Sequence, residues 1–408
     1  MLHVHHLPMS TWRSFRTGYV QVAIILLTTT ILFLLVNGIA FLLLNDEQPD
    51  HNPVVDRYGN RIYDAYPGWE RSAVDSLLNQ SYPKPSFIYE AYSQFREIPR
   101  QGKYVNVVKH GFRVNRPQGP WPIDSAGFNI FVFGGSTTFG YGVPDSSTIP
   151  ARLQAHLGRR LQGRITRVYN FGRGYHFSFQ ERVVFESLLR QGHHPDLAIF
   201  IDGANDFALW KHTQGQPRFT PTLRGFFSQI GRRKALWAID LPVMHYLRQR
   251  EHNAQTTVAI SEFQVPDTDW QEMIAHYQRN RRMTEAVARA FGIDILFVWQ
   301  PISSYRYDYK QYHPLGNTIT ESSETYGELV AGIAARPNDL YMLNLAGIQE
   351  EEHQNLYVDM VHYNPYFNDR IAARIAERVQ QLLATAPASP VQQAPHIPPL
   401  TTTPVQTR

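Results

Sequence analysis

From Phe128 onward, short apolar runs alternate with longer stretches of helical periodicity. This alternation is typical of βαβ units, in which parallel strands are buried on both faces. The sequence therefore predicts a doubly wound α/β fold. The five predicted strands are Phe128–Phe133, Thr166–Phe171, Asp196–Asp202, Asp294–Gln300 and Asp339–Leu345, and the predicted helices are Ile149–Leu161, Phe179–Gln191, Trp270–Phe291 and Pro365–Ala384.

Residues 18–44 contain no charged side chain and are long enough to cross a membrane as a helix. We interpret this segment as a single transmembrane helix. Arg13 and Arg16 precede it, and Asp46 and Glu47 follow it. The positive-inside rule then places residues 1–17 in the cytoplasm and the bulk of the chain outside, in a periplasm or at the cell surface. The alternative is a cleaved signal peptide, whose apolar region would be shorter.

The remaining segments differ in composition. Residues 45–127 mix aromatic, proline and charged residues without a clear period, which predicts an irregular stalk and covering segment. The globular domain is expected at residues 128–384. Within it, residues 207–267 form a long insertion between the third and fourth strands, and such insertions tend to be functional lids. Residues 385–408 are rich in Pro, Thr and Gln and are predicted to be a disordered tail.

Composition excludes several classes of function. The sequence contains no cysteine, which rules out disulfides, thiolate catalysis and cysteine-based zinc sites. The net charge of +4 is not gathered into a dense basic block, so we do not expect a nucleic-acid partner. No HExxH or comparable spacing occurs, and we therefore predict neither a metal nor a cofactor.

Polar residues and glycines follow four of the predicted strands. In an open parallel sheet the carboxyl ends of the strands meet at one edge, where ligands bind. We therefore expect these residues to converge on one site. They are Ser136 after the first strand, Gly172 and Gly174 after the second, Asn205 after the third, and Asp359 and His362 after the fifth.

These residue types suit acyl transfer. A serine hydroxyl becomes a nucleophile when a base accepts its proton, and His362 is the candidate base for Ser136. Asp359 lies three residues before His362, within reach to orient the imidazole. The backbone N–H groups of Ser136 and Gly174 and the side-chain amide of Asn205 are candidate donors to the oxyanion of the tetrahedral intermediate.

The segments "GGSTTFG", "NFGRGYH", "DGAND" and "DMVH" occur in the order of the four sequence blocks of the SGNH (GDSL-like) hydrolases. Over about residues 128–206 and 294–380 the chain resembles a membrane-anchored member of that superfamily. The resemblance implies the SGNH hydrolase fold, with a flavodoxin-like parallel five-stranded sheet. It also implies a serine esterase with Ser136, Asp359 and His362 as the triad and Ser136, Gly174 and Asn205 as the oxyanion hole.

Two positions depart from the family pattern. Gly135 stands where an aspartate usually precedes the nucleophile. Gly174 lies four residues beyond Asn170, whereas the family spacing is about five. Either Gly172 or Gly174 could therefore supply the backbone N–H to the oxyanion, and we prefer Gly174. Gln300, at the end of the fourth strand, is either a substrate contact or a structural amide.

The sequence thus predicts an extracytoplasmic serine esterase that acts on an acyl ester through an acyl-enzyme. Acetyl groups on an envelope carbohydrate and lipid esters are the substrates that the resemblance suggests. One alternative is an O-acyltransferase that modifies an envelope polysaccharide, since it differs only in the acceptor of the acyl group. Another is a non-catalytic scaffold that binds glycan and keeps His362 far from Ser136.

Overall fold

The computed structural model describes residues 9–44, 53–83, 86–115, 118–215, 270–313, 324–333 and 339–385. The chain divides into two units: residues 1–50 with 227–261, and residues 51–226 with 262–408. Of the first unit, the described part is the helix α1 (Met9–Leu44). The other described elements belong to the second unit, which contains the predicted site residues.

Helix α1 contains an apolar stretch, Arg16–Leu42, whose 27 residues are long and apolar enough to cross a membrane. Thr28 and Thr30 donate their hydroxyl hydrogens to backbone carbonyls one turn earlier, which satisfies these polar groups within the helix. A signal sequence near an N-terminus also meets these criteria of length and apolarity. The helix is therefore compatible with both predictions for this segment.

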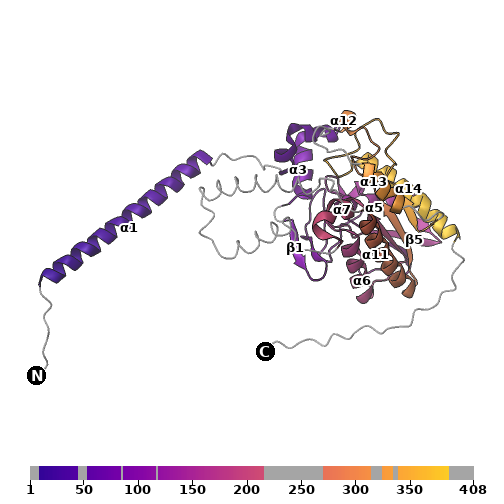
Figure 1. The fold of residues 1–408 in the computed structure, drawn as a ribbon, viewed down its shortest axis with the longest axis horizontal. Coiled ribbons are helices and arrows are strands. Elements are labelled where there is room, and N and C mark those ends of the chain that lie inside the picture. The colour runs from indigo at the N-terminus through magenta and orange to yellow at the C-terminus, as the bar shows by residue number, and fades with distance from the viewer. Residues whose placement is uncertain are drawn as a thin grey trace, which may run out of the picture. The chain divides into compact units, whose positions relative to one another are not determined.

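The second unit is built on a six-stranded sheet in the order β4-β5-β3-β6-β7-β8. Figure 1 shows this unit, with β5 labelled in the sheet. Five of these strands are parallel. If they are numbered one to five along the chain, their order across the sheet is 2-1-3-4-5, which is the flavodoxin-like order. They are β3 (Gly127–Gly134), β5 (Arg164–Asn170), β6 (Leu197–Asp202), β7 (Asp294–Trp299) and β8 (Met342–Asn344).

The sixth strand, β4 (Arg160–Leu161), corrects the predicted count of five. Gln162 and Gly163 both have positive φ, 48° and 77°, and form a tight turn that folds β4 back antiparallel to β5. The helix predicted for Ile149–Leu161 ends early, at Leu157, where Gly158 takes a φ of 75°. Gly158 and the turn at Gln162 and Gly163 therefore override the helical pattern.

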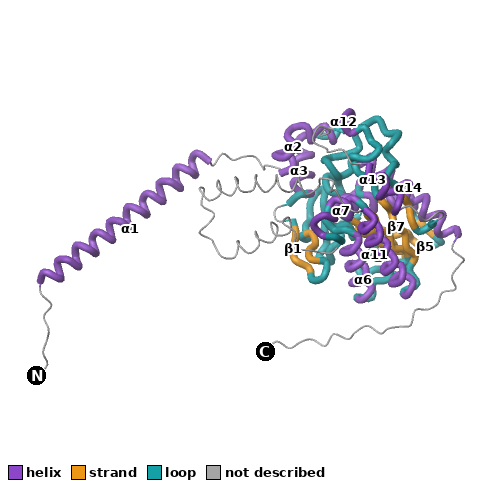
Figure 2. The backbone as a smooth tube through the Cα atoms, viewed as in Figure 1, coloured by secondary structure: helices purple, strands orange, loops and turns teal. Residues whose placement is uncertain are grey.

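Helices cover both faces of the sheet (Figure 2). The helices α5 (Ile149–Leu157) and α14 (Pro365–Thr385) share one apolar core with the strands, and α6 (Ser178–Arg190) and α11 (Trp270–Ala290) share the other. Three of these agree with the predicted helices to within a few residues. The other described helices after residue 115 are α4 (Ser136–Phe139), η2 (Asp145–Ser147), α7 (Ala204–Ala208), α8 (Trp210–Thr213), α12 (Tyr309–Tyr312) and α13 (Glu324–Ile333).

The two cores differ because alternate residues of a strand point to opposite faces. Ile130 and Val132 belong to the core with α5 and α14, which is largely aliphatic. On the opposite face, four phenylalanines from neighbouring strands stack in a row, with ring centroids 4.9 to 5.5 Å apart. This row crosses neighbouring strands and is formed by Phe171, Phe133, Phe200 and Phe297.

Residues 53–115, which we call the covering segment, contain short helices and a two-stranded hairpin. The sequence predicts an irregular stalk and covering segment over residues 45–127. The apolar side chains of residues 53–115 form a third core that continues into Phe139, Tyr141 and Val358. Packing in this core explains why these short helices and strands are stable although the sequence shows no clear hydrophobic period. The elements are α2 (Pro53–Tyr58), η1 (Gly59–Ala65), α3 (Arg71–Ser81) and the antiparallel hairpin of β1 (Phe87–Glu90) and β2 (Gln94–Glu97).

Two predicted segments fall largely outside the described residues. The insertion 207–267 is described as far as residue 215, and the tail 385–408 only at Thr385. In the described part of the insertion, Phe207 and Trp210 are buried in the core beside α11. Phe207 stacks on Trp270 with ring centroids 5.3 Å apart, so these aromatic side chains serve packing.

Candidate active site

Ser136 is the first residue of α4 and lies directly beyond β3. The first N–H groups of a helix have no carbonyl partner within the helix, so the N–H of Ser136 is suited to hold an anion. The Ser136 side chain is partly exposed, whereas the three residues after it are buried. Gly140 ends α4 with a φ of 89°, and a Cβ there would lie 2.6 Å from Thr148, so this turn requires glycine.

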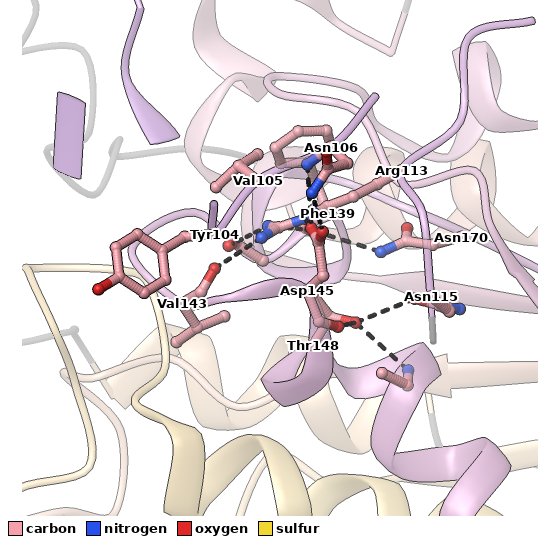
Figure 3. Close-up of polar contacts among 12 residues, drawn as sticks. Tyr104, Val105, Asn106, Arg113, Asn115, Phe139, Val143, Asp145, Thr148 and Asn170 are labelled. Atoms are coloured by element: carbon pink, nitrogen blue, oxygen red, sulfur yellow. Dashed lines mark hydrogen bonds and ion pairs between the residues drawn. The ribbon is translucent and has the colours of Figure 1, made fainter. Parts of the chain in front are cut away.

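A buried polar network holds this turn in place (Figure 3). Arg113, from the covering segment, places Nε 2.9 Å from Asp145 Oδ1 and donates from Nη1 to the carbonyls of Phe139 and Gly140 at 2.8 and 2.5 Å. Asn170 Nδ2 donates to the Thr138 carbonyl at 3.0 Å. Because the last carbonyls of a helix lack partners within it, these side chains satisfy them and fix the turn that carries Ser136.

Asp359 and His362 lie together in a tight turn after β8. Asp359 Oδ1 accepts the backbone N–H groups of Val361 and His362 at 2.9 and 2.8 Å. Asp359 Oδ2 lies 2.7 Å from His362 Nδ1. Burial acts to raise the pKa of Asp359, but the charge of His362 and these hydrogen bonds outweigh it and hold the pKa well below its usual range. The ionised carboxylate therefore orients the imidazole.

The other ring nitrogen of His362 is a buried polar atom. Nε2 has no hydrogen-bond partner within the part of the chain that the structure describes. A buried imidazole nitrogen usually has a partner, so Nε2 is suited to accept a proton from a reacting group.

Gln300 connects the histidine turn to the serine turn. Its Oε1 accepts hydrogen bonds from Thr137 Oγ1 at 2.6 Å and from Tyr363 OH at 3.0 Å. Thr137 and Tyr363 directly follow Ser136 and His362 in the sequence. One buried carboxamide thus joins the two segments, and of its two predicted roles the structural one is observed, while contact with substrate stays a prediction.

Asn205 lies in α7, just beyond β6. Its Nδ2 donates to the His176 carbonyl at 2.7 Å. A Cβ on Gly135 would lie 2.4 Å from the same nitrogen, so the amide approaches the backbone next to Ser136 closely. The missing side chain of Gly135 permits that approach. An amide nitrogen carries two hydrogens, and His176 accepts one of them.

The N–H groups of both candidate glycines have acceptors. Gly172 donates to Asn170 Oδ1 at 2.9 Å, and Gly174 donates to Glu97 Oε1 at 2.6 Å. A Cβ on Gly172 would lie 2.3 Å from the backbone nitrogen of Phe139, so Gly172 allows close packing on α4. The oxyanion role predicted for Gly174 therefore requires that its N–H leave Glu97.

Glu97 is buried at the end of β2 and also accepts a hydrogen bond from Tyr141 OH at 3.2 Å. Burial raises the pKa of Glu97, and the Gly174 N–H and the charges of Arg173 and Arg100 oppose that rise. A carboxyl group thus lies at the position where the sequence predicts a free oxyanion donor.

Three buried carboxyl groups lie around the Asn205 loop. Asp206 Oδ1 accepts the Ser178 hydroxyl at 2.5 Å, and Asp202 Oδ2 accepts the Tyr277 hydroxyl at 2.8 Å. Burial raises the pKa of Asp202 to about 7 and that of Glu181 well above its usual range, and the charges of neighbouring carboxylates add to both shifts. Both oxygens of Glu181 and Oδ1 of Asp202 lack a donor among the described residues. The raised pKa values of both groups and the hydrogen bond between their side chains favour a proton held between them.

A metal site and a surface pocket are two further features that could serve function. Within the described ranges, no group of three or more His, Cys, Asp or Glu is arranged to hold a metal ion. An open pocket of about 400 Å³ is lined by residues that include Tyr305, Asn344 and Arg374, and none of the predicted site residues lines it.

Sequence reasoning missed the side chains that the covering segment contributes. These are Tyr82, whose hydroxyl lies 2.9 Å from Asp359, together with Glu97 and Arg113. Short apolar alternation in "VNVVKHGFRVN", residues 105–115, is a signal that could have predicted packed extended structure around Arg113. Tyr82 and Glu97 stand in no motif, so only the folded chain reveals them.

No family model matches the sequence, and no curated protein matches it. Similar solved structures include the carbohydrate acetylesterase Est24 of Sinorhizobium meliloti, at 13% identity and a TM-score of 0.34 over 62% of this chain and 99% of that one. The acetylxylan esterase Axe2 of Geobacillus stearothermophilus is similar at 14% identity and a TM-score of 0.33, over 62% and 94% of the two chains. With TM-scores below 0.5, these likenesses do not assign the chain to a family.

Proposed function

We propose that this chain is a serine esterase of the SGNH type that hydrolyses an acyl ester. One observation carries the proposal: the His362 imidazole is held by the ionised Asp359 at 2.7 Å, and its Nε2 is left unpaired among the described residues. Gln300 joins the turn of this pair to the turn of Ser136. Acyl transfer needs a base, a carboxylate that orients the base and a hydroxyl nucleophile, and His362, Asp359 and Ser136 can fill these roles.

In the proposed reaction, Ser136 Oγ attacks the carbonyl carbon of the ester while His362 Nε2 takes the hydroxyl proton. The bond from that carbon to the alcohol oxygen then breaks, and His362 returns the proton to the leaving alcohol. Water next attacks the acyl carbon while His362 takes a proton from it. The bond from that carbon to Ser136 Oγ then breaks, His362 returns the proton to Oγ, and the acid leaves. Asp359 stays ionised and stabilises the imidazolium at each step.

The oxyanion formed in each attack would be held by the N–H of Ser136 and the side-chain amide of Asn205. The approach of Asn205 Nδ2 to Gly135 supports this pairing, because it brings the amide beside the serine backbone. The N–H of Gly174 becomes a third donor once it is released from Glu97. We propose an acetyl ester of an envelope carbohydrate, or a lipid ester, as the substrate.

We further propose that α1 anchors the esterase in a membrane as a single span, with the N-terminus in the cytoplasm and the second unit outside. The length and apolarity of Arg16–Leu42 support a span, and the basic residues before it support the orientation. Carbonate extraction of membranes tests the anchor, since a cleaved chain would enter the soluble fraction.

The function is tested on the full-length chain in detergent with a fluorophosphonate probe and 4-nitrophenyl acetate. The wild type should be labelled and should hydrolyse the ester, and Ser136→Ala should do neither. His362→Ala should lower the rate of labelling by about a thousandfold or more. Ser187→Ala and His156→Ala, which alter a serine and a histidine outside the site, are the matched controls. Equal labelling of the wild type and Ser136→Ala would overturn the proposal.

A further inference from the structure

Tyr82 follows the last residue of α3 and belongs to the covering segment. Its N–H donates the last hydrogen bond of the helix, to the Leu78 carbonyl at 2.9 Å, and its own backbone leaves the helical region at a ψ of 58°. Leu77 and Leu78 are buried in the third core, so the end of α3 is held by packing. This packing places the Tyr82 side chain against the turn that contains Asp359, 277 residues later in the sequence.

The Tyr82 hydroxyl contacts the pair of side chains that would act in catalysis. It donates to Asp359 Oδ2 at 2.9 Å and lies 3.4 Å from His362 Nδ1. Asp359 Oδ2 is the oxygen that also lies 2.7 Å from Nδ1. One carboxylate oxygen is therefore shared between the imidazole and the phenol.

The ring of Tyr82 also contributes to the position of the imidazole. Tyr82 and Tyr141 have centroids 5.1 Å apart, and Tyr141 lies 5.4 Å from the His362 ring. Tyr82 itself meets the His362 ring edge-on at 6.2 Å. The two tyrosines therefore limit how far the imidazole can rotate away from Asp359.

Tyr82 acts as a donor at any working pH. Burial and the charge of Asp359 raise the pKa of Tyr82 well above its usual range, so the phenol keeps its proton. The other titratable groups that face Asp359 are Tyr66, on which its charge acts, and His313, whose Nε2 lies 2.8 Å from the Asp359 backbone carbonyl. Among the described side chains, Tyr82 and His362 are those that hydrogen-bond to the carboxylate of Asp359.

We propose that Tyr82 is a positioning residue that sets how strongly Asp359 stabilises the protonated His362. The hydrogen bond from Tyr82 draws part of the negative charge of Oδ2 away from Nδ1–H, so it limits the stability of the imidazolium. It also fixes the rotation of the carboxylate. The inference rests on the proposed function, because it concerns the residue that serves as base.

The test compares Tyr82→Phe with the wild type in full-length protein, by the rate of fluorophosphonate labelling of Ser136 across pH. Without the phenol hydroxyl, Asp359 stabilises the imidazolium more, so the acidic limb of the profile should move to higher pH by about half a unit to one unit. Tyr82→Met, which also lacks the donor, should move the limb in the same direction.

Tyr63→Phe is the matched control. Tyr63 also belongs to the covering segment, and its hydroxyl donates to a carboxylate outside the site, Asp75 Oδ1, at 2.6 Å. This variant should leave the acidic limb where it is in the wild type. If Tyr82→Phe slows labelling equally at all pH values, or moves the limb to lower pH, Tyr82 is not a positioning residue in this sense.

A second measurement separates this inference from the proposed function. If the wild type is not labelled at any pH, the proposed function has failed. The reaction of His362 with diethyl pyrocarbonate, followed across pH by peptide mass spectrometry, then reports on the imidazole directly, because only its neutral form reacts. A shift of that profile to higher pH in Tyr82→Phe supports the role of Tyr82, and identical profiles in the two proteins overturn it.

Discussion

The carboxylate of Glu97 accepts a 2.6 Å hydrogen bond from the backbone N–H of Gly174. The two residues lie 77 positions apart, and the hairpin of the covering segment brings them together. Glu97 thereby occupies the donor that sequence analysis assigns to the oxyanion. An oxyanion bound to Gly174 would have to replace Glu97 and would lie close to its negative charge.

Glu97→Gln is expected to raise kcat at alkaline pH if Gly174 serves the oxyanion. The amide keeps an oxygen for the Gly174 N–H but removes the charge that would repel the developing anion, for a gain of about three- to tenfold. Because burial raises the pKa of Glu97, the gain should shrink as pH falls and the wild-type carboxyl becomes protonated. Ester hydrolysis across pH measures both effects.

Glu90→Gln is the control for this change, since Glu90 lies on the same hairpin and pairs with Arg96 and Arg173 without contacting Gly174. Its kcat should equal that of the wild type. If Glu97→Gln leaves kcat unchanged or lowers it at every pH, Gly174 is not an oxyanion donor.

Gly172→Ala should be far more damaging than Gly174→Ala. At Gly172 the new methyl would lie 2.3 Å from a backbone nitrogen of α4, which cannot yield without moving the serine turn. At Gly174 the nearest atoms are the ends of the Phe87 and Tyr141 side chains, both 3.0 Å away. We expect a loss of unfolding free energy of about 3 kcal/mol or more for Gly172→Ala and about 1 kcal/mol for Gly174→Ala, measured by chemical denaturation. Equal losses would show that α4 does not depend on this close approach.

Arg113→Ala should strongly reduce stability. The change leaves the buried Asp145 without its cation and removes the hydrogen bonds that Arg113 donates to the carbonyls of Phe139 and Gly140. Removing one partner of a buried ion pair costs about 3 to 5 kcal/mol. The control Arg374→Ala breaks an ion pair with Glu377 whose side chains are more than half exposed, 58% and 57%, and should have little effect. A similar melting temperature for both variants would contradict the proposed importance of the network.

Glu181→Gln should make the protein less sensitive to alkaline pH. A carboxyl group whose pKa is raised by folding contributes most to stability when protonated, so wild-type stability falls as pH rises from about 4 toward the Asp202 pKa of about 7. The glutamine amide can donate to Asp202 Oδ1, which lacks a donor among the described residues. We expect the melting temperature of the variant to exceed that of the wild type at pH 8 and to approach it at pH 5.

Glu186→Gln on the same helix, where Glu186 pairs with Arg182, should follow the wild type at both pH values. Parallel pH dependence of Glu181→Gln and the wild type would mean that Glu181 and Asp202 do not share a proton.

Much of the architecture could be predicted from local patterns. Apolar runs of strand length predicted β3, β5, β6 and β7 closely, because a strand buried on both faces needs apolar residues along its whole length. The pairing of Asp359 with His362 was also predictable, since residues three apart meet within one turn. The two-residue strand β4 was missed, because the turn at Gln162 and Gly163 interrupts a pattern that reads as helix.

Local patterns were enough to predict which residues follow the parallel strands, because strand period and turn chemistry act over a few residues. The side chains from residues 53–115 that reach them depend on the folded chain: Arg113 on the carbonyls after Ser136, Glu97 on Gly174 and Tyr82 on Asp359. A buried polar group must find a partner wherever packing places one, and packing joins segments that no local pattern relates.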